Sequence, residues 1–364
     1  MNIRFIDAGM VSGLRSQSIY HGLGYAQQPD TPNTIVLVTP ESPYLCIGFF
    51  QDPEIELDMN YCRSKQLPVI RRETGGGTVY IDNEQLFVQW IFQQSSLPRR
   101  VDKRFELFVE PLIETYKFFG IDAYYHPIND VHVNGKKIVG TGAGTIGEGQ
   151  VVTGNFLFDF DYSTMLDSIK VPNKDFRDAV AKNLDSYLTN MKRELNQVPE
   201  RSEVIRVYRK KCQEILGLKI ESGCFTDKEL RVMEEIENKF NKESWLHQTK
   251  GKPSKNKLFK IHLGVWIGYM NYDFDNGSMT AIITMQDGYL SEIKLAINNI
   301  KALNYSIQKL ENTLQGVKME RELIAQKVKS IVDNSHCNEW VECIYKMKEL
   351  QLQQAGHGTM ARSN

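Results

Sequence analysis

RRETGGGTVYID, residues 71–82, is the stretch that constrains the fold most strongly. The flanking segments PVIRRE (68–73) and TVYI (78–81) are rich in β-branched and aromatic residues, so each predicts a β-strand. The run Gly75 to Gly77 is therefore expected in a turn between two strands. The nucleotide-binding patterns GxGxxG and GxxxxGK(S/T) both need a strand, a turn and then a helix. This order argues against a Rossmann or P-loop nucleotide site.

The glycine run is also a candidate binding loop. Glycine adopts positive φ and carries no Cβ, so a ligand can approach the backbone closely. Exposed N–H groups in such a loop can face phosphate or carboxylate oxygens, and Arg72 supplies a planar cation suited to the same oxygens. The alternative is a mobile hairpin turn with a solvated arginine. A two-residue hairpin needs only one or two special φ angles, so a third glycine is surplus to a simple turn.

A second constellation covers residues 129–147, NDVHVNGKKIVGTGAGTIG. Asn134-Gly135 between alternating apolar residues predicts a hairpin with a type I′ turn. Lys137 follows this turn and is a candidate for pointing into a pocket, where its ammonium would pair with a carboxylate and then with a phosphate. Lys136 is its competitor, and the alternative is that both lysines are exposed beside the turn.

The residues around this hairpin are candidates as well. The run Gly140 to Gly144 is unusually small, which indicates close approach of the backbone to a ligand or to another strand. Asn129 and Asp130 are candidate contacts for adenine edges and for a Mg²⁺ ion. Their alternative role is to cap a turn.

Strands and helices around the two motifs predict an α+β domain. Further predicted strands cover 34–39, 44–50, 86–92 and 151–161, and predicted helices cover 12–26, 55–67 and 104–120. Residues 165–245 are mostly helical by their apolar period. We therefore expect residues 1–248 to form a mixed, largely antiparallel sheet flanked by helices.

A smaller domain is predicted to follow. The polar, basic segment 249–257 contains Gly and Pro and is the expected linker. Short strands within 259–290 precede helices predicted at 291–302, 305–332 (with a break near Gln315-Gly316) and 336–352. This pattern predicts a small α+β domain over 258–352. The remaining residues, 353–364, are expected to be a disordered tail.

Composition excludes several functional classes. The formal net charge is -1, from 44 basic and 45 acidic residues, so nothing draws the whole chain to nucleic acid or to an anionic membrane. No segment reaches the roughly 20 apolar residues that span a bilayer, and the N-terminus lacks a signal-peptide core. We expect a cytoplasmic protein. The six cysteines form no CxxC pair, which is typical of reduced thiols, and the histidines show no metal-ligand spacing.

Taken together, these segments resemble the lipoate–protein ligase family. Its motif RR-x-(S/T)-GGG-x-V-(F/Y/H)-HD stands here as residues 71–82, with Ile81 in place of the histidine. The motif ND…NGKK(I/V)-x-G-(S/T) stands here as Asn129-Asp130 and residues 134–141. The familiar HHG after it is replaced by VTGN. The resemblance covers about residues 1–250, and the segment 258–350 is similar to the accessory domain of the longer ligases.

The resemblance implies a biotin/lipoate ligase-like fold and an ATP-dependent reaction with Mg²⁺. Lipoate or octanoate would form an acyl-adenylate and pass to a lysine of a carrier, either a lipoyl domain of a 2-oxo acid dehydrogenase complex or the glycine cleavage H protein. Lys137 would contact both the carboxylate and the phosphate of the adenylate. The residues that it implies for binding substrate or ATP are Arg72, Thr74, Gly75, Gly76, Gly77, Val79, Tyr80, Asp82, Asn129, Asp130, Gly140, Thr141 and Gly142.

Three other functions fit this sequence less well. An octanoyltransferase would use a cysteine thioester, but no cysteine lies between Pro68 and Lys211. Biotin ligation is disfavoured because a GRGRxGR-like loop is missing. A non-catalytic lipoyl-domain-binding protein would have no need of Lys137 together with an intact glycine loop. The ligase is therefore the favoured function.

Overall fold

The computed structural model describes residues 2–251, 254–262, 264–275, 277–298, 305–332 and 336–360, with side chains as far as Gln353. The chain divides into two compact units. The first comprises Met1–Ser168 and Tyr187–Gly251, and the second comprises Ile169–Ser186 and Lys252–Asn364. The boundary between the two units after Gly251 falls within the expected linker, 249–257. The segment Ile169–Ser186 was expected in the first domain but clusters with the second unit.

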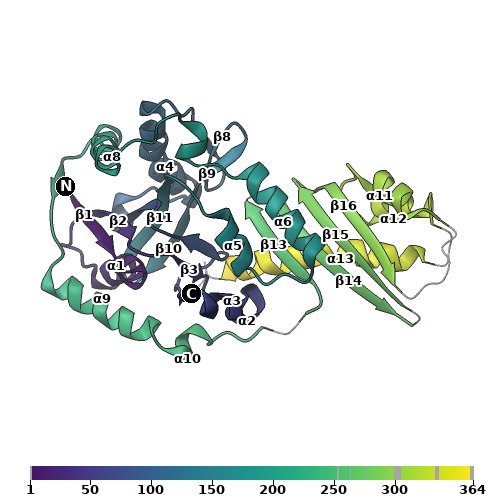
Figure 1. The fold of residues 1–364 in the computed structure, drawn as a ribbon. Coiled ribbons are helices and arrows are strands. Elements are labelled where there is room, and N and C mark those ends of the chain that lie inside the picture. Colours follow the sequence, from purple (N-terminus) through teal and green to yellow (C-terminus); the bar gives the residue numbers. More distant parts are fainter. Residues whose placement is uncertain are drawn as a thin grey trace. The chain divides into compact units, whose positions relative to one another are not determined.

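The first unit is built on a six-stranded sheet (Figure 1). The strands follow the order β10 (Gly142–Ile146), β11 (Gly149–Leu157), β6 (Gln85–Phe92), β2 (Thr34–Pro40), β1 (Ile3–Val11) and β12 (Ile220–Ser222). Strands β10, β11, β6 and β2 pair antiparallel, whereas β1 pairs parallel with both β2 and β12. The sheet is therefore mixed and largely antiparallel, as predicted. Strands β1 and β12 were not predicted from the sequence.

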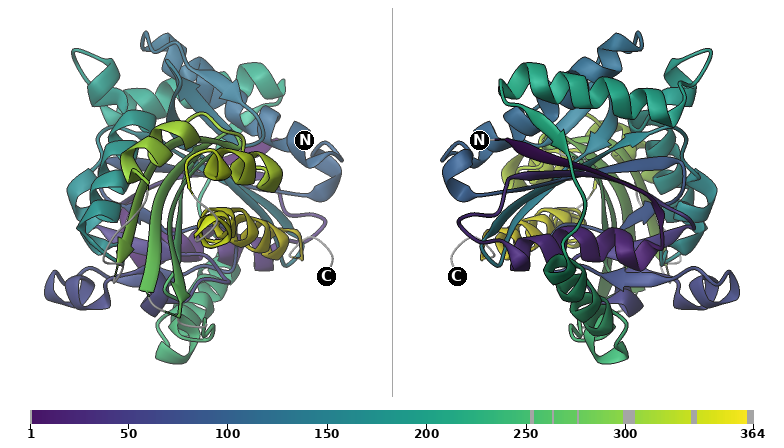
Figure 2. Two further views of the ribbon diagram at one scale, coloured as in Figure 1. Left: turned by 90° about the vertical axis from the view of Figure 1, so that its right-hand side faces the viewer. Right: turned by 90° about the vertical axis from the view of Figure 1, so that its left-hand side faces the viewer.

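Helices cover both faces of this sheet. On one face, Trp90 of β6 packs against Phe108 of α4 (Val101–Phe118) and donates from Nε1 to the Tyr208 hydroxyl of α8 (Arg201–Leu216) at 2.9 Å. On the other face, α1 (Gly13–Ala26) and α9 (Asp227–Phe240) bury Ile19 and Met233 against the strands. The right-hand view of Figure 2 shows the purple α1 and the teal α8 on opposite sides of the strands. Every residue of β2 is buried, and successive side chains of a strand point to opposite faces of the sheet. Both faces of the sheet are therefore covered at β2.

Two three-stranded sheets carry the predicted motifs. One has the order β4 (Val69–Arg71), β3 (Tyr44–Ile47) and β5 (Val79–Ile81). The other is an antiparallel meander of β7 (Tyr124–His126), β8 (Asp130–Val133) and β9 (Lys136–Gly140). The remaining short elements are α2 (Pro53–Glu56), α3 (Met59–Ser64), η1 (Gln94–Ser96), α5 (Tyr162–Ser168), α7 (Met191–Glu194) and α10 (Glu243–Leu246).

The single helix predicted over 55–67 is wrong. Two short helices, α2 and α3, occupy this region. Asp58 separates them because its carboxylate accepts hydrogen bonds from the backbone N–H groups of Asn60 and Tyr61, which makes it the N-cap of α3. Leu57, with an extended backbone, ends α2, and the capping aspartate then starts a new helix.

The second unit is α+β, as predicted. Its antiparallel sheet has the order β13 (Lys257–His262), β14 (Val265–Phe274), β15 (Gly277–Gln286) and β16 (Tyr289–Asn298). Its helices are α6 (Lys174–Tyr187), α11 (Ile307–Leu314), α12 (Arg321–Lys329) and α13 (Cys337–Met360). Helices α11 to α13 contribute Leu310, Ile324 and Trp340 to its core.

Two predictions for this unit need correction. The helix predicted over 291–302 is a strand as far as Asn298, because Ile293 and Leu295 are buried while Glu292 and Lys294 are exposed, a period of two. Residues 299–302 lie outside the described part of the chain. The tail predicted from 353 is helical to Met360, as a continuation of α13; residues 361–364 are not described. The break expected near Gln315-Gly316 is confirmed by Gly316, whose φ is 79°.

None of the helices within the described residues combines the length and the apolar character needed to span a bilayer.

Candidate active site

The β8–β9 hairpin turns as predicted. Asn134 and Gly135 have φ angles of 50° and 79°, and a type I′ turn requires positive φ at both central residues. Asparagine and glycine are the residues that reach this region at least cost. The turn sends β9 back along β8, with Lys137 opposite His132 and Gly140 opposite Asp130.

Lys137 lies in a buried ion pair. Its Nζ is 2.8 Å from Oδ1 of Asp130, whose side chain is only 2% exposed, while 21% of the Lys137 side chain is exposed. The backbone of Lys137 is fixed as well, because its carbonyl accepts a hydrogen bond from the Thr189 N–H at 2.9 Å. Of the two candidate lysines, Lys137 is therefore the one that pairs with the buried carboxylate.

The end of the hairpin leaves room for this lysine. A Cβ at Gly140 would stand 3.2 Å from Cε and 3.3 Å from Nζ of Lys137. Beyond it, Thr141 and Asn129 bind each other: the Asn129 amide donates to the Thr141 carbonyl at 3.1 Å, and the Thr141 hydroxyl donates to the Asn129 carbonyl at 2.5 Å. Asn129 therefore closes the end of the hairpin, and its contact with a nucleotide stays a prediction.

The glycine loop, Gly75 to Gly77, connects β4 to β5 and is exposed. Its centre has positive φ, with 95° at Gly76. Arg72 folds back over the loop, and its Nη2 donates to the carbonyls of Gly75 and Gly77, each at 2.8 Å. Its Nη1 donates to the Cys46 carbonyl at 3.1 Å. Arg72 thus braces the loop, and its contact with phosphate stays a prediction.

Two residues that sequence reasoning missed shape this loop. The first is Gly48, at the end of β3. A Cβ there would lie 2.1 Å from the Gly76 carbonyl oxygen, so no other residue fits beside the loop. The neighbouring Phe49 N–H donates to the Thr74 carbonyl at 3.0 Å. The only signal in the sequence was the single glycine in LCIGFF, which marks a close approach of backbones but does not identify the partner.

The second is Arg71, which is fully buried. Its Nη2 donates to the Leu246 carbonyl at 2.6 Å, and its Nη1 donates to the Phe49 carbonyl at 2.5 Å. In return, the Trp245 indole N–H donates to the Arg71 carbonyl at 2.9 Å. Burial lowers the pKa of Arg71. The two adjacent arginines therefore differ: Arg71 fastens α10 to β4, and Arg72 holds the glycine loop.

Strand β10 brings the two motifs together. A Cβ at Gly144 would lie 3.2 Å from Cγ2 of Thr74, so β10 packs against the residue that begins the glycine loop. The same strand starts at Gly142, two residues after Gly140, whose position abuts Lys137. The small side chains of 140–144 are thus explained by close packing on both motifs.

The residues after the glycine loop differ in exposure. Val79 is 41% exposed, whereas Tyr80 and Asp82 are buried. Asp82 accepts a hydrogen bond from the Glu84 N–H at 3.1 Å, and burial raises its pKa to about 6. The Tyr80 ring meets Phe160 edge-on at 5.7 Å, and burial followed by the Asp82 charge raises the pKa of its phenol. Val79 faces solvent near the loop, and Asp82 belongs to the interior.

The cysteines of the first unit are poorly suited to nucleophilic attack. Cys46 is fully buried beside Arg72, whose Nη1 is 3.6 Å from its Sγ, and burial nevertheless raises its pKa. Burial also raises the pKa of Cys62, to about 11, and that of Cys212. Cys224 is exposed, in the segment between β12 and α9.

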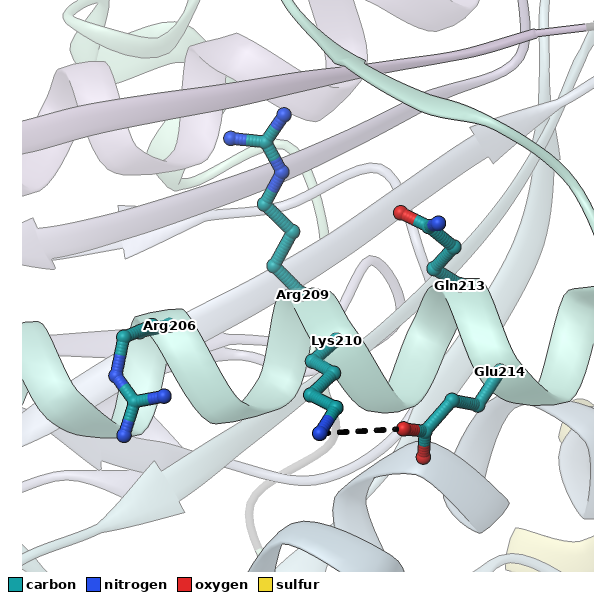
Figure 3. Close-up of a pocket in the computed structure, with 5 residues that line it drawn as sticks. All are labelled: Arg206, Arg209, Lys210, Gln213 and Glu214. Carbon is teal, nitrogen blue, oxygen red and sulfur yellow. Dashed lines mark ion pairs between the residues drawn. The ribbon is translucent and has the colours of Figure 1, made fainter.

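A surface pocket of about 390 Å³ lies on α8 (Figure 3). Its lining residues are Arg206, Arg209, Lys210, Gln213 and Glu214. Arg209 is committed to the Ile220 carbonyl at 3.0 Å, and Lys210 pairs with Glu214 at 3.7 Å. None of the predicted site residues lines it, so this pocket is not part of the candidate site.

Comparison with known proteins adds two findings on sequence. The family model for the lipoyl protein ligase A/B catalytic domain matches residues 23–213, which include both motifs. The chain is 24% identical over 273 residues to octanoyltransferase LipM of Anoxybacillus flavithermus, covering 66% of this chain and 96% of that protein. It is 23% identical over 301 residues to lipoate–protein ligase 2 of Staphylococcus aureus, covering 79% of this chain and 83% of that protein.

Solved structures share the fold. A bipartite lipoate protein ligase from Thermoplasma acidophilum, analysed with its E2 lipoyl domain, superposes with a TM-score of 0.63 and 22% identity, over 70% of this chain and 99% of that one. A lipoate–protein ligase A bound with ATP superposes with a TM-score of 0.58 and 19% identity, over 68% of this chain and 99% of that one. These likenesses confirm the predicted fold class.

Proposed function

The chain belongs to the lipoyl protein ligase A/B catalytic domain family of lipoate ligases and octanoyltransferases, and from this premise we propose that it is an ATP-dependent lipoate– or octanoate–protein ligase. The acceptor is a lysine on a lipoyl domain or on the glycine cleavage H protein. The relatives support attachment of a lipoyl or octanoyl group in general. The choice between ligase and transferase rests on the residues of this chain.

The positions and the burial of the cysteines are the observation that favours a ligase over a transferase. A transferase that proceeds through a thioester needs a reactive thiolate in its site, and such a thiolate is made by a lowered pKa and by access. No cysteine lies between Cys62 and Cys212 in this sequence. Cys46, the thiol beside the glycine loop, is sealed from solvent and its pKa is raised. ATP activation requires no such thiol.

The extent of the similarity to relatives supports the same choice. Residues 1–251 make up about 69% of the chain, so an alignment covering 79% of it has to extend past Gly251 into the C-terminal part of the second unit. That alignment is with a lipoate–protein ligase, whereas the alignment with the octanoyltransferase covers 66% of the chain. The ATP-bound ligase of the same fold supports ATP as the nucleotide.

The proposed reaction has two balanced steps. A carboxylate oxygen of the acid forms a bond to the α-phosphorus of ATP, and the bond to pyrophosphate breaks. The amine of the acceptor lysine then attacks the acyl carbon of the adenylate, AMP leaves with the bonding electrons, and the amine loses a proton. Both steps need negative charge on oxygen to be stabilised in a site that excludes water.

Lys137 is the residue proposed to stabilise that charge. Asp130 holds its ammonium at 2.8 Å, so the cation is in place before substrate arrives. Groups placed in advance lose little orientational freedom when charge develops, and removal of one such contact typically costs about 10²–10³ in rate. The open N–H groups of the glycine loop are the proposed second contact with the phosphate or the acid.

Mg²⁺ enters this reaction with ATP as part of the substrate. Asp130 was predicted as a possible ligand for it. A Mg²⁺ ion requires several oxygen ligands in octahedral geometry, and Asp130 already faces the Lys137 ammonium at 2.8 Å. Asp130 therefore already pairs with a cation of the protein, and in the proposed reaction the Mg²⁺ ion arrives bound to ATP.

The deciding experiment is the mass of a purified lipoyl domain after incubation with this protein, ATP, Mg²⁺ and either lipoate or octanoate. The ligase predicts a gain of one acyl group that requires ATP and is lost in Lys137→Ala. A gain from octanoyl-acyl carrier protein without ATP, abolished in Cys46→Ala, would instead establish the transferase. A protein that binds the lipoyl domain without modifying it under either condition would be a non-catalytic binder.

A further inference from the structure

Glu73 occupies the unspecified position of the motif, between Arg72 and Thr74, and its carboxylate is held from two sides. The Tyr25 hydroxyl donates to Oε2 at 2.7 Å, and Lys239 Nζ donates to Oε1 at 2.5 Å. The Glu73 side chain is 11% exposed, which limits competition from water. Tyr25 comes from α1 and Lys239 from α9, so two helices far apart in sequence meet at the residue that precedes the loop.

The backbone of Glu73 is held by a third residue, His21 of α1. The Glu73 N–H donates to Nε2 of His21 at 3.1 Å. On the other side of the ring, Nδ1 lies 2.7 Å from the Gln17 carbonyl, which can only accept. Nδ1 therefore carries the proton and Nε2 is an acceptor, so the two partners fix one neutral tautomer of His21.

The surroundings of His21 keep it in that form. The ring is completely buried, and Phe240 of α9 meets it edge-on at 4.9 Å. The pKa of His21 is lowered to about 4, chiefly by burial; the charges of Lys239 and Arg72 act in the same direction, while the Gln17 carbonyl and Glu73 oppose the shift. At neutral pH the acceptor at Nε2 is present throughout the folded population.

The same helices brace the strand that leads into the loop. Lys239 Nζ lies 4.1 Å from the centre of the Trp245 ring, which stacks on Phe240 at 5.6 Å. Trp245 in turn donates to the Arg71 carbonyl. Of the three residues that hold Glu73, His21 and Lys239 lie outside the residues 23–213 that match the family model.

We propose that His21, Tyr25 and Lys239 are positioning residues. Their hydrogen bonds to Glu73 fix the glycine loop for catalysis. Glu73 leads into Thr74 and the three glycines, so its three contacts set where the loop begins, together with the hydrogen bond from the Phe49 N–H to the Thr74 carbonyl. Glycine has more backbone freedom than any other residue, and a loop of three glycines keeps a defined shape only if its ends are fixed. This inference rests on the proposed function.

The first test compares two amides in place of His21. In His21→Gln, the side-chain oxygen can reach the position of Nε2 and accept from Glu73. In His21→Asn it reaches only the position of Nδ1. We expect His21→Asn to lower kcat/KM for acid-dependent pyrophosphate release about tenfold, the usual worth of a lost hydrogen bond, and His21→Gln to restore most of it.

Amide hydrogen exchange gives a readout that does not depend on activity. The peptide that contains Glu73 should exchange at least about tenfold faster in His21→Asn than in the wild type, and at nearly the wild-type rate in His21→Gln. Equal kcat/KM in the two variants, or faster exchange without any change in kcat/KM, would overturn the proposal.

A second pair of variants avoids the buried ring, in case His21 substitutions fail to fold. Tyr25 and Lys239 are partly exposed, so Tyr25→Phe and Lys239→Met should fold. We expect each to raise KM for the acid or for ATP several-fold, with faster exchange at Glu73 and an unchanged melting temperature. Lys228→Met, at an exposed lysine of the same helix, is the matched control and should match the wild type. Wild-type KM values in both Tyr25→Phe and Lys239→Met would overturn the proposal that these residues position the loop.

The experiments distinguish a failure of the proposed positioning role from a failure of the proposed function. If the wild type shows no ATP-dependent turnover, the same variants are compared in acyl transfer from octanoyl-acyl carrier protein and in binding of a sulfamoyl analogue of octanoyl-AMP. Faster amide exchange at Glu73, together with weaker binding of the analogue or slower acyl transfer, would support the same positioning role in a transferase. Faster exchange with wild-type values for both would overturn it.

Discussion

Lys137 reaches Asp130 diagonally across the β8–β9 hairpin, with 2.8 Å between Nζ and Oδ1. The two are not register partners, since Asp130 lies opposite Gly140 and Lys137 lies opposite His132. The lysine side chain therefore runs past Gly140, where a Cβ would stand 3.2 Å from its Cε. A shift of register between Val131 and His132 accompanies this arrangement. The hairpin thus combines a buried acid, a cation and a glycine into one charged site.

Replacement of Lys137 should remove most of the catalytic activity. We expect Lys137→Met to lower the rate of acid-dependent pyrophosphate release by about 10²–10³, because the preorganised cation is lost. It should also lower stability by roughly 3 kcal/mol, since the buried Asp130 carboxylate loses the ammonium that lies 2.8 Å from its Oδ1. Urea denaturation and a pyrophosphate assay measure the two effects separately.

Lys136→Met is the matched control, because Lys136 precedes Lys137 and lies next to the turn at Gly135. It should retain a rate within about threefold of the wild type, as expected for a partly exposed side chain outside the ion pair. A large loss in Lys136→Met with little loss in Lys137→Met would show that the two lysines had been assigned the wrong way round.

A methyl group at Gly140 should affect activity more than stability. The new Cβ would crowd Cε and Nζ of Lys137, which stand 3.2 and 3.3 Å away, and the flexible end of the lysine has to move by a few tenths of an ångström. A small displacement of a charged contact can cost on the order of tenfold or more in rate. We expect Gly140→Ala to lower kcat by at least tenfold with a melting temperature close to the wild type. A normal kcat would mean that the position of the ammonium is not critical.

Local patterns predicted the two motifs well. The turn at Asn134-Gly135 needs only residues that tolerate positive φ, and its partner strand is adjacent in sequence. The glycine loop was placed between two strands for the same reason. Features of this kind depend on interactions within a few residues, so a sequence contains nearly all the information that they require.

The contacts that complete the site come from distant segments. Gly48 approaches Gly76, Arg71 binds the Leu246 carbonyl, and Glu73 meets Lys239. Nothing within a window of ten residues identifies these partners. Residues 290–298 show the same limit, because Leu290, Ile293 and Ile297 fit a helical period while Ile293 and Leu295 fit a strand; pairing with β15 decides the outcome.

The raised pKa of Asp82 predicts a pH-dependent stability change. Burial raises it to about 6, above the ordinary value for aspartate near 3.9, so the folded state binds a proton more tightly than the unfolded state does. Stability from this group is therefore present below about pH 4 and is lost as the pH rises through about 6. Above that pH the buried carboxylate destabilises the fold by up to about 3 kcal/mol, at 1.36 kcal/mol for each unit of the pKa difference.

Asp82→Asn removes the charge and keeps an oxygen that can accept from the Glu84 N–H. We expect the variant to be more stable than the wild type at pH 8 and no more stable at pH 4, as measured by urea denaturation at each pH. A stabilisation of equal size at both values would assign the effect to packing, and a destabilisation at pH 8 would show that the ionised carboxylate is needed by the fold.

The segment Ile169–Ser186 predicts what happens when the second unit is cut away after Gly251. Helix α6 packs within that unit: the buried Phe176 ring meets Tyr269 edge-on at 6.4 Å, and the Asn183 amide donates to the Thr284 hydroxyl at 3.4 Å. Truncation would leave α6 attached to the first unit without these partners. Exposure of a large apolar side chain costs about 1.5–3 kcal/mol, so we expect residues 1–251 alone to bind a hydrophobic dye and to aggregate.

The matched variant of this truncation carries Phe176→Ser. It removes the buried aromatic side chain of α6 that meets Tyr269, and it leaves the sheet of the first unit, with Trp90 and Phe108, unchanged. We expect it to bind less dye and to remain soluble at higher concentration than the unmodified truncation, because replacing phenylalanine with serine reduces the exposed apolar surface. Equal dye binding by the two proteins, with both remaining monomeric, would mean that α6 refolds onto the first unit and needs no partner from beyond Gly251.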